Sequence, residues 1–229
     1  MTFSIVARSA DARLFGVAIA SSSPAVAARC AYARAAVGAA VSQNVTDPAL
    51  GPRLLEGLAA GAAPEQALEL CLQSTPFGAY RQLLAIGPRG PPVAHSGALA
   101  LGCAGVALGA HAAAAGNLLC DAGIPAAMLA AFEADRGPLA ARLLGALRAA
   151  LALGGEAGPV HSAGLLVVRE LSWPIIDLRV DWHDADPVAA LGALWERYAP
   201  QVEDYVQRAL DPSRAPGFGV PGDCSATAR

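Results

Sequence analysis

The chain opens with MTFSIVARSADARLFGVAIASSS, residues 1–23, and this stretch decides the fold. Residues 2–9 and 13–20 are apolar segments separated by a polar turn around Asp11, so they predict two β-strands. Thr2 directly follows the initiator methionine, which is generally removed when a small residue comes second. Without Met1, the first strand would begin with a residue that carries both a hydroxyl and a free α-amine.

The rest of the chain continues in blocks of strands and blocks of helices. Further strands are predicted over residues 36–43, 81–87, 91–100, 105–116, 163–171 and 175–183. Helices are predicted over residues 53–60 and 64–73, in two segments after Pro125, and from Pro187 onward. Several strands are apolar on both faces, and strands do not strictly alternate with helices. This pattern favours an α+β fold, a four-layer αββα sandwich of two mostly antiparallel sheets.

The last helical segment has a recognisable start. Asp186 and Pro187 are typical of an N-cap and a first helical position. One helix is expected from there, with its apolar side chains facing inward: Val188, Leu191, Leu194, Tyr198, Val202 and Tyr205. Residues 1–210 are expected to form a single domain. Residues 211–229 are rich in Pro, Gly and Ser, which predicts a disordered tail.

The composition excludes several function classes. All 16 basic residues are arginine, which excludes a Schiff-base lysine, a pyridoxal phosphate site, a P-loop and a Ser–Lys dyad. The formal net charge of −3 gives no indication of nucleic-acid binding. The five cysteines are odd in number and widely spaced, which argues against a disulfide framework or a zinc site. With no visible signal peptide, we expect a cytoplasmic protein without a cofactor.

Residues 90–120 contain no Asp, Glu or Arg and require a check for a membrane span. Pro, His, Asn and several Gly interrupt them, so buried strands explain this stretch better than a membrane helix. Hydrophobic residues make up 55% of the chain and charged residues 15%. So much apolar surface favours a homodimer or a higher homo-oligomer.

Several motifs, taken in their order and spacing, carry a resemblance. They are TFSIVAR, GVAIAS, the SQ…DP…G…L…G segment, YRQ, HSG, GN with two following apolar residues, and DLRVDWH. Over roughly residues 2–195 the chain resembles the domain-of-unknown-function family 1028 of bacteria and archaea. The resemblance implies an N-terminal-nucleophile (Ntn) hydrolase fold, which is an αββα sandwich, and implies no particular substrate. The chain departs from the family pattern at Cys103–Val106 and at Glu156–Ser162.

In Ntn hydrolases the side chain of the first residue attacks an amide carbonyl, and the α-amine of that residue takes up the proton. Thr2 is therefore the candidate nucleophile; the alternative is an ordinary second residue. Ser21, at the end of the second strand, is expected to lie beside Thr2 and orient its amine, or to form a polar turn. Arg34 is the candidate cation that lowers the pKa of the amine, or an exposed arginine.

Three amide side chains are candidates for holding the substrate. Asn117 follows an apolar strand, and it either stabilises the oxyanion or completes the strand end. Backbone N–H groups near Gln43 and Asn44 could also hold an oxyanion, or these side chains satisfy the turn. His95, in the HSG motif, is a further substrate-binding candidate.

In DLRVDWH, strand alternation places four polar residues on one face: Asp177, Arg179, Asp181 and His183. They could bind a charged substrate or a metal, or form ion pairs on a solvated edge, and carboxylate–arginine pairing is the default. The leading function is hydrolysis of a C–N bond in a small amide, imine or cyclic amide. The alternatives are a non-catalytic ligand-binding or assembly protein on the same fold, and a metal-dependent hydrolase centred on Asp181 and His183.

Overall fold

The computed structural model describes residues 2–220. Its six-stranded sheet has the order β10-β9-β2-β1-β8-β7, and its four-stranded sheet has the order β3-β4-β5-β6. The first sheet contains β1 (Thr2–Arg8), β2 (Phe15–Ser21), β7 (Gly105–Leu108), β8 (Ala112–Asn117), β9 (Ser162–Val168) and β10 (Ile176–Val180). The second contains β3 (Ala31–Arg34), β4 (Gly38–Asn44), β5 (Arg81–Ile86) and β6 (Val93–Ser96). The strands of both sheets pair antiparallel.

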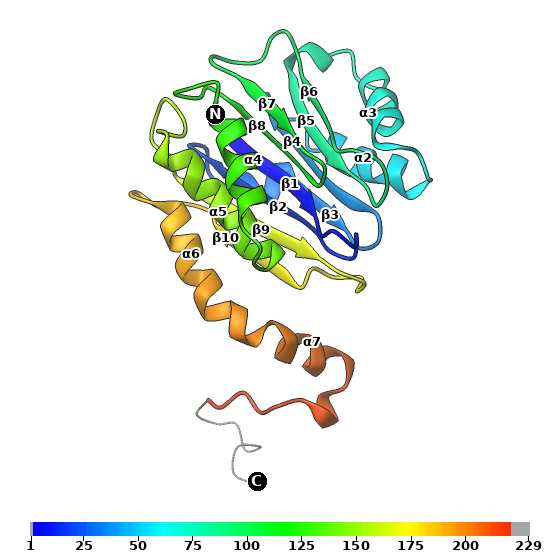
Figure 1. The fold of residues 1–229 in the computed structure, drawn as a ribbon, viewed down its shortest axis with the longest axis vertical. Coiled ribbons are helices and arrows are strands. Elements are labelled where there is room, and N and C mark those ends of the chain that lie inside the picture. The colour runs from blue at the N-terminus through cyan, green and yellow to red at the C-terminus, as the bar shows by residue number, and fades with distance from the viewer. Residues whose placement is uncertain (1, 221–229) are drawn as a thin grey trace. The chain divides into compact units, whose positions relative to one another are not determined.

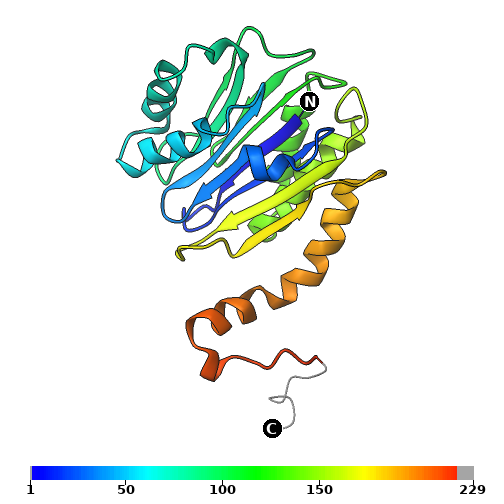
Figure 2. The ribbon, with the colours of Figure 1, turned by 180° about the vertical axis from the view of Figure 1, so that it is seen from behind.

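Helices cover the outer face of each sheet. α4 (Ile124–Ala134) and α5 (Leu139–Ala152) pack on the six-stranded sheet, whereas α2 (Leu50–Ala59) and α3 (Pro64–Gln73) pack on the four-stranded sheet (Figure 1). The sheets pack on each other through β1, β2, β4, β5 and β8. Seen from behind, β9 and β10 extend the first sheet beside β2, and the short helix α1 (Val26–Cys30) lies close to it (Figure 2). The layers are therefore αββα, as the sequence predicts.

The apolar core between the sheets follows from strand alternation. Val6, Val17 and Ile19 of the first sheet meet Val41 and Leu84 of the second, and all five side chains are fully buried. The strands are apolar on both faces because the opposite face of each sheet also packs against helices. Polar side chains that are buried between the sheets are therefore exceptions to this apolar pattern.

The prediction of one continuous final helix is wrong. Two helices, α6 (Pro187–Tyr198) and α7 (Val202–Leu210), are separated by a 3₁₀ turn at Ala199–Gln201. Pro200 lies in that turn, where its ring and missing N–H interrupt the helical hydrogen bonds. Leu194 and Tyr205, predicted to face inward, are 39% and 41% exposed.

The start of that segment is as predicted, because the Asp186 carboxylate accepts the Ala189 N–H at 2.8 Å. The chain divides after Gly192 into two units. Within the second unit the Tyr198 and Tyr205 rings stack, with centroids 5.6 Å apart. The predicted disordered tail begins with a 3₁₀ turn at Pro212–Arg214, and its residues 221–229 lie outside the described residues.

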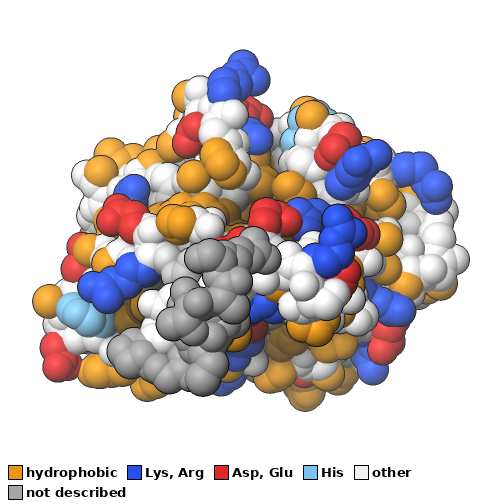
Figure 3. Space-filling view, turned by 90° about the horizontal axis from the view of Figure 1, so that it is seen from below, with side chains coloured by type: hydrophobic (Ala, Val, Ile, Leu, Met, Phe, Trp, Pro, Cys, Tyr) orange, Lys and Arg blue, Asp and Glu red, His pale blue; other side chains and the backbone are white. Residues whose placement is uncertain are grey.

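Within residues 2–220, no helix is both long and apolar enough to cross a membrane. The uncharged stretch 90–120 instead contributes β6, β7 and β8. On the face shown in Figure 3, acidic and basic side chains are interspersed among apolar ones. This mixture agrees with the small net charge of the whole chain.

Candidate active site

Polar side chains gather at one end of the sandwich, between the two sheets. Thr2 begins β1 and pairs directly with Asn117, the last residue of β8. Ser21 ends β2 and pairs with Ser162, the first residue of β9. Residues directly opposite each other in a sheet point their side chains to the same face. The register therefore brings Thr2, Ser21 and Asn117 together, although they are far apart in the sequence.

A chain of hydroxyl groups leads away from Thr2. The Thr2 side chain is 4% exposed, and its hydroxyl donates to Ser21 Oγ over 3.4 Å. Ser21 Oγ lies 2.8 Å from Ser23 Oγ, which in turn accepts a hydrogen bond from Arg29 Nη2 at 2.8 Å. A guanidinium group is thus linked to Thr2 through two serines.

Arg34 does not take this place. It pairs with Gly38 at the start of β4, whereas Gln43 lies at the other end of that strand, beside the polar cluster. The structure therefore does not bring Arg34 to Thr2. Arg29 was not singled out from the sequence, because its link to the site runs through Ser23 in a neighbouring turn.

A buried network of amide side chains joins the two sheets. Gln82 Nε2 donates to the main-chain carbonyl of Gly116 at 3.0 Å, so Gln82 Oε1 must face the other way and accept. It accepts from Gln43 Nε2 at 2.7 Å and from Asn117 Nδ2 at 3.1 Å. Gln43 Oε1 then accepts the Ser4 hydroxyl at 2.7 Å. One main-chain carbonyl thus fixes the orientation of three side-chain amides.

This orientation leaves one acceptor without a donor. Asn117 is fully buried, its Nδ2 is directed at Gln82, and its Oδ1 has no hydrogen-bond partner within the described structure. A buried polar atom without a partner costs about 1–3 kcal/mol. Such an atom beside Thr2 is suited to bind a ligand that presents an N–H or O–H group.

Glu156 is a further site residue that the sequence reasoning did not single out. It is 2% exposed, and its two carboxylate oxygens accept the Ser22 N–H at 3.1 and 3.2 Å. Burial raises the pKa of Glu156 to about 7, and the hydrogen bonds from Ser22 oppose that shift. The available signal was a single acidic residue between two apolar stretches, LALGG and AGPV.

Asp177 and Arg179 lie on a different edge of the sandwich. Their side chains form an ion pair, with Arg179 Nε 2.8 Å from Asp177 Oδ1, as expected for carboxylate–arginine pairing on one strand face. Together with Tyr32 and Arg34 they line a cavity of about 390 Å³. The structure thus groups these predicted residues with one another and not with Thr2.

The predicted strand 175–183 is too long, because β10 ends at Val180. Asp181 and His183 therefore lie beyond the strand, and alternation does not place them on one face with Asp177. His183 Nδ1 accepts two main-chain N–H groups, from Ala185 and Asp186, at 3.1 and 3.0 Å. Within residues 2–220, no group of three or more His, Cys, Asp or Glu side chains could hold a metal ion.

Asn44 and His95 make local contacts with the main chain. Asn44 Nδ2 donates to the Tyr80 carbonyl at 2.6 Å, and its Oδ1 accepts the Leu101 N–H at 3.1 Å. His95 Nε2 lies 2.9 Å from the carbonyl oxygen of Gly78. Both side chains therefore hold loops near the ends of β4, β5 and β6.

The cysteines described by the structure offer no buried nucleophile. Cys30, Cys71, Cys103 and Cys120 are all free thiols. Burial raises the pKa of Cys71 to about 11 and also raises that of Cys30, so neither forms a thiolate readily.

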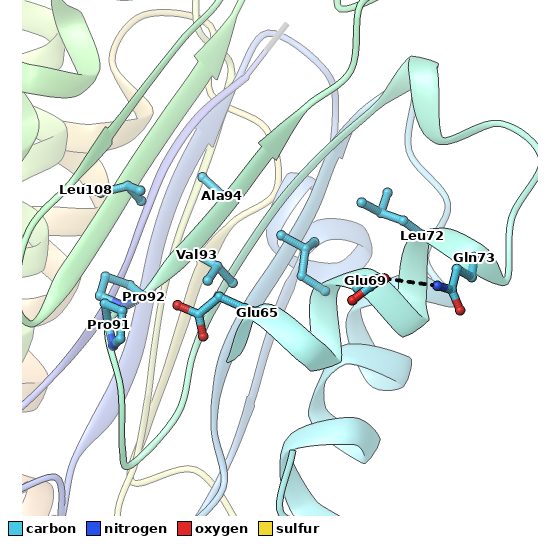
Figure 4. A pocket seen from close by; sticks show the side chains of 10 residues that line it. Glu65, Glu69, Leu72, Gln73, Pro91, Pro92, Val93, Ala94 and Leu108 are labelled. Carbon is cyan, nitrogen blue, oxygen red and sulfur yellow. Dashed lines mark hydrogen bonds between the residues drawn. The ribbon is translucent and has the colours of Figure 1, made fainter. Parts of the chain in front are cut away.

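A larger cavity of about 790 Å³ is lined by residues outside the polar cluster, and Figure 4 shows this cavity from close by. Leu72 of α3, Val93 of β6 and Leu108 of β7 line it, and Glu65 and Glu69 supply its carboxylates. It contains none of the candidate residues from the sequence. We therefore place the candidate active site at the polar cluster around Thr2 and not in this cavity.

Two antiparallel sheets between two helical layers, with a polar cluster where the first strand begins, define an αββα sandwich protein. The chain belongs to a family of unknown function, DUF1028, whose family model matches residues 2–191.

One solved structure comes from the same family. The crystal structure of protein SPO2555 from Silicibacter pomeroyi, a DUF1028 protein, is 31% identical, with a TM-score of 0.82 over 90% of this chain and 94% of that one. Anbu (ancestral beta-subunit) from Yersinia bercovieri is 11% identical, with a TM-score of 0.39 over 95% of this chain and 100% of that one. No curated protein sequence matches the chain.

Proposed function

We propose that this protein is an N-terminal-nucleophile hydrolase that cleaves a C–N bond in a small amide, imine or cyclic amide. The observation that carries the proposal is the position of Thr2, which opens β1 inside the sandwich and pairs with the buried Asn117. Removal of Met1, which lies outside the described residues, would place an α-amine and a hydroxyl on this one residue. A nucleophile with its own base needs both groups.

The chemistry divides into two steps. For an amide, Thr2 Oγ1 attacks the carbonyl carbon while the α-amine takes the hydroxyl proton and passes it to the leaving nitrogen. The C–N bond breaks and an ester forms on Thr2. Water, deprotonated by the same amine, then hydrolyses the ester and regenerates the hydroxyl.

The surrounding side chains have separate roles in this proposal. Ser21 orients Thr2 through the contact between their hydroxyls. Asn117 Nδ2 carries a second hydrogen besides the one directed at Gln82, and this second N–H would stabilise the oxyanion. Gln82 positions Asn117 from the facing sheet, and Gln43 in turn holds Gln82.

Substitution of Thr2 tests the proposal. Untagged protein is assayed for hydrolysis of a panel of small amides, imines and cyclic amides. Thr2→Ala should lower kcat/KM by about 1,000-fold or more, whereas Thr2→Ser should retain measurable turnover. Thr75→Ala, a matched threonine substitution away from the site, should leave turnover unchanged. Full activity in Thr2→Ala would overturn the proposal.

A second candidate is a protein that binds a small polar molecule at the same site without reacting with it. The unpartnered Asn117 Oδ1 supports this candidate, because a buried acceptor can bind a ligand without a nucleophile. Titration calorimetry with the same panel distinguishes the two. Equal binding to wild-type and Thr2→Ala protein, with no product from either, would favour the binding protein.

A further inference from the structure

Glu156 is a buried carboxylate without an ion-pair partner among the described side chains. None of the ion pairs found within residues 2–220 includes Glu156. Its hydrogen bonds within the described residues come from Ser22 alone, although a carboxylate has about four acceptor positions. A buried charge in this situation is costly unless a cation or further donors reach it.

The main chain places this carboxylate beside the start of β1. Ser22, which holds Glu156, directly follows Ser21, whose hydroxyl contacts that of Thr2. Leu119, which lies two residues after Asn117 at the end of β8, forms an isolated β-bridge with Glu156. The end of β2 and the end of β8 thus bring two hydrogen-bond acceptors to the region of Thr2. These are the Glu156 carboxylate, which has few donors, and Asn117 Oδ1, which has none in the described structure.

We propose that the Glu156 carboxylate and Asn117 Oδ1 together bind the α-ammonium group of Thr2 after Met1 is removed. An ammonium group carries three N–H donors and one positive charge, which match a carboxylate and a neutral acceptor. This inference rests on the proposed function, since it concerns the amine that serves there as the base. Glu156 is a positioning residue: it holds the amine beside the Thr2 hydroxyl and stabilises the ammonium form that the amine reaches when it takes up the hydroxyl proton.

Other charged or titratable groups also face this region. His161 lies near Glu156 and opposes the rise in the pKa of that carboxyl. The Arg29 guanidinium reaches the cluster through Ser23. The Cys120 thiol donates to the main-chain carbonyl of Glu156 at 2.9 Å. Because His161 and Arg29 are positive when protonated, Glu156 is the group that favours a positive charge on the amine.

The absence of lysine makes this amine measurable on its own. The α-amine is the one primary amine in the chain, so an acylating reagent specific for amines labels a single site. The full chain beginning at Thr2 is released from a cleavable N-terminal fusion. The rate of labelling is then followed from pH 5 to pH 9 by intact mass, without any substrate.

The expected result is a change in the pH midpoint of labelling. Glu156→Gln should lower the midpoint by about one pH unit, because loss of an adjacent opposite charge disfavours the ammonium form. Asn117→Leu should lower it by less. The control Glu133→Gln, an exposed carboxylate on α4, should leave it unchanged. An identical midpoint in wild-type and Glu156→Gln protein would overturn the inference.

If Glu156→Gln does not fold, Glu156→Asp takes its place. Aspartate retains the charge but is shorter than glutamate. The labelling midpoint of Glu156→Asp should therefore be lower than that of wild-type protein, but by less than the decrease of about one pH unit expected without the carboxylate. A midpoint equal to that of wild-type protein overturns the inference. The assay is independent of turnover. A shifted midpoint in a protein that hydrolyses nothing would refute the proposed function alone, whereas an unchanged midpoint in an active enzyme would refute the role of Glu156 alone.

Discussion

The side-chain amide of Gln82 donates to the main-chain carbonyl of Gly116 at 3.0 Å. A carbonyl oxygen can only accept, so this bond fixes which end of the Gln82 amide faces the first sheet. The orientations of Gln43 and Asn117 follow from it. The lack of a hydrogen-bond partner at Asn117 Oδ1 therefore follows from the position of the main-chain carbonyl of Gly116, the residue that precedes Asn117 in β8.

Replacement of Gln82 by Glu tests this chain of donors. Glutamate supplies no N–H for Gly116 and puts a buried charge at the centre of the network. We expect Gln82→Glu to lower the free energy of unfolding by about 2–4 kcal/mol, measured by urea denaturation. The control Gln66→Glu, at an exposed first-turn position of α3, should change it by less than about 0.5 kcal/mol. Equal effects at the two positions would contradict the network.

Asn117→Leu should separate stability from function. Leucine removes the buried unpaired oxygen, while Gln82 Oε1 keeps its bond from Gln43. The free energy of unfolding should change by less than about 1 kcal/mol, because a costly polar atom is replaced by an apolar group of similar size. Turnover should fall by about 100-fold or more, since the oxyanion donor is lost. A large loss of stability with unchanged turnover would show that Asn117 serves the fold and not the site.

Alanine substitutions at two glycines should have opposite effects on the stability of the protein. A Cβ on Gly97 would collide with the main-chain carbonyls of Ala79 and Gly78, so Gly97→Ala should destabilise the protein by about 1–3 kcal/mol. Gly145, in the middle of α5, has open space where a Cβ would lie. Gly145→Ala should therefore stabilise by about 0.5–1 kcal/mol through helix propensity. Thermal unfolding of both variants checks the two signs, and equal signs would contradict this account.

Cysteine alkylation should follow burial. At pH 8 the native protein should react rapidly at the exposed Cys103 and Cys120. Cys71, whose pKa burial raises to about 11, and Cys30 should stay unmodified until denaturant is added. Peptide mapping after brief treatment with iodoacetamide gives the order. Rapid native labelling of Cys71 would show that the contact between α2 and α3 opens in solution.

The sequence predicted the two opening strands and the αββα layers because buried strands leave a strong apolar pattern. It also singled out Thr2, Ser21, Gln43 and Asn117 as candidates, since each lies where an apolar strand starts or ends. Their meeting at one end then depends on strand order, which the register establishes.

The missed features depend on long-range geometry. Helix α1 and strand β3, together residues 26–34, are short and alanine-rich, and they show no clear periodicity. Arg34 was assigned to the site, but it lies at the opposite end of its strand pair from Gln43. Glu156 was passed over because its importance comes from a hydrogen bond to Ser22, which is 134 residues away in sequence.

The most direct measurement is the intact mass of purified, untagged protein produced from its own start codon. A nucleophilic Thr2 requires a free α-amine on that residue. We predict a mass lower by one methionine than that of the full sequence, with Thr2 as the first residue. A mass that retains Met1 in active protein would contradict it, because the base proposed for Thr2 would then not exist.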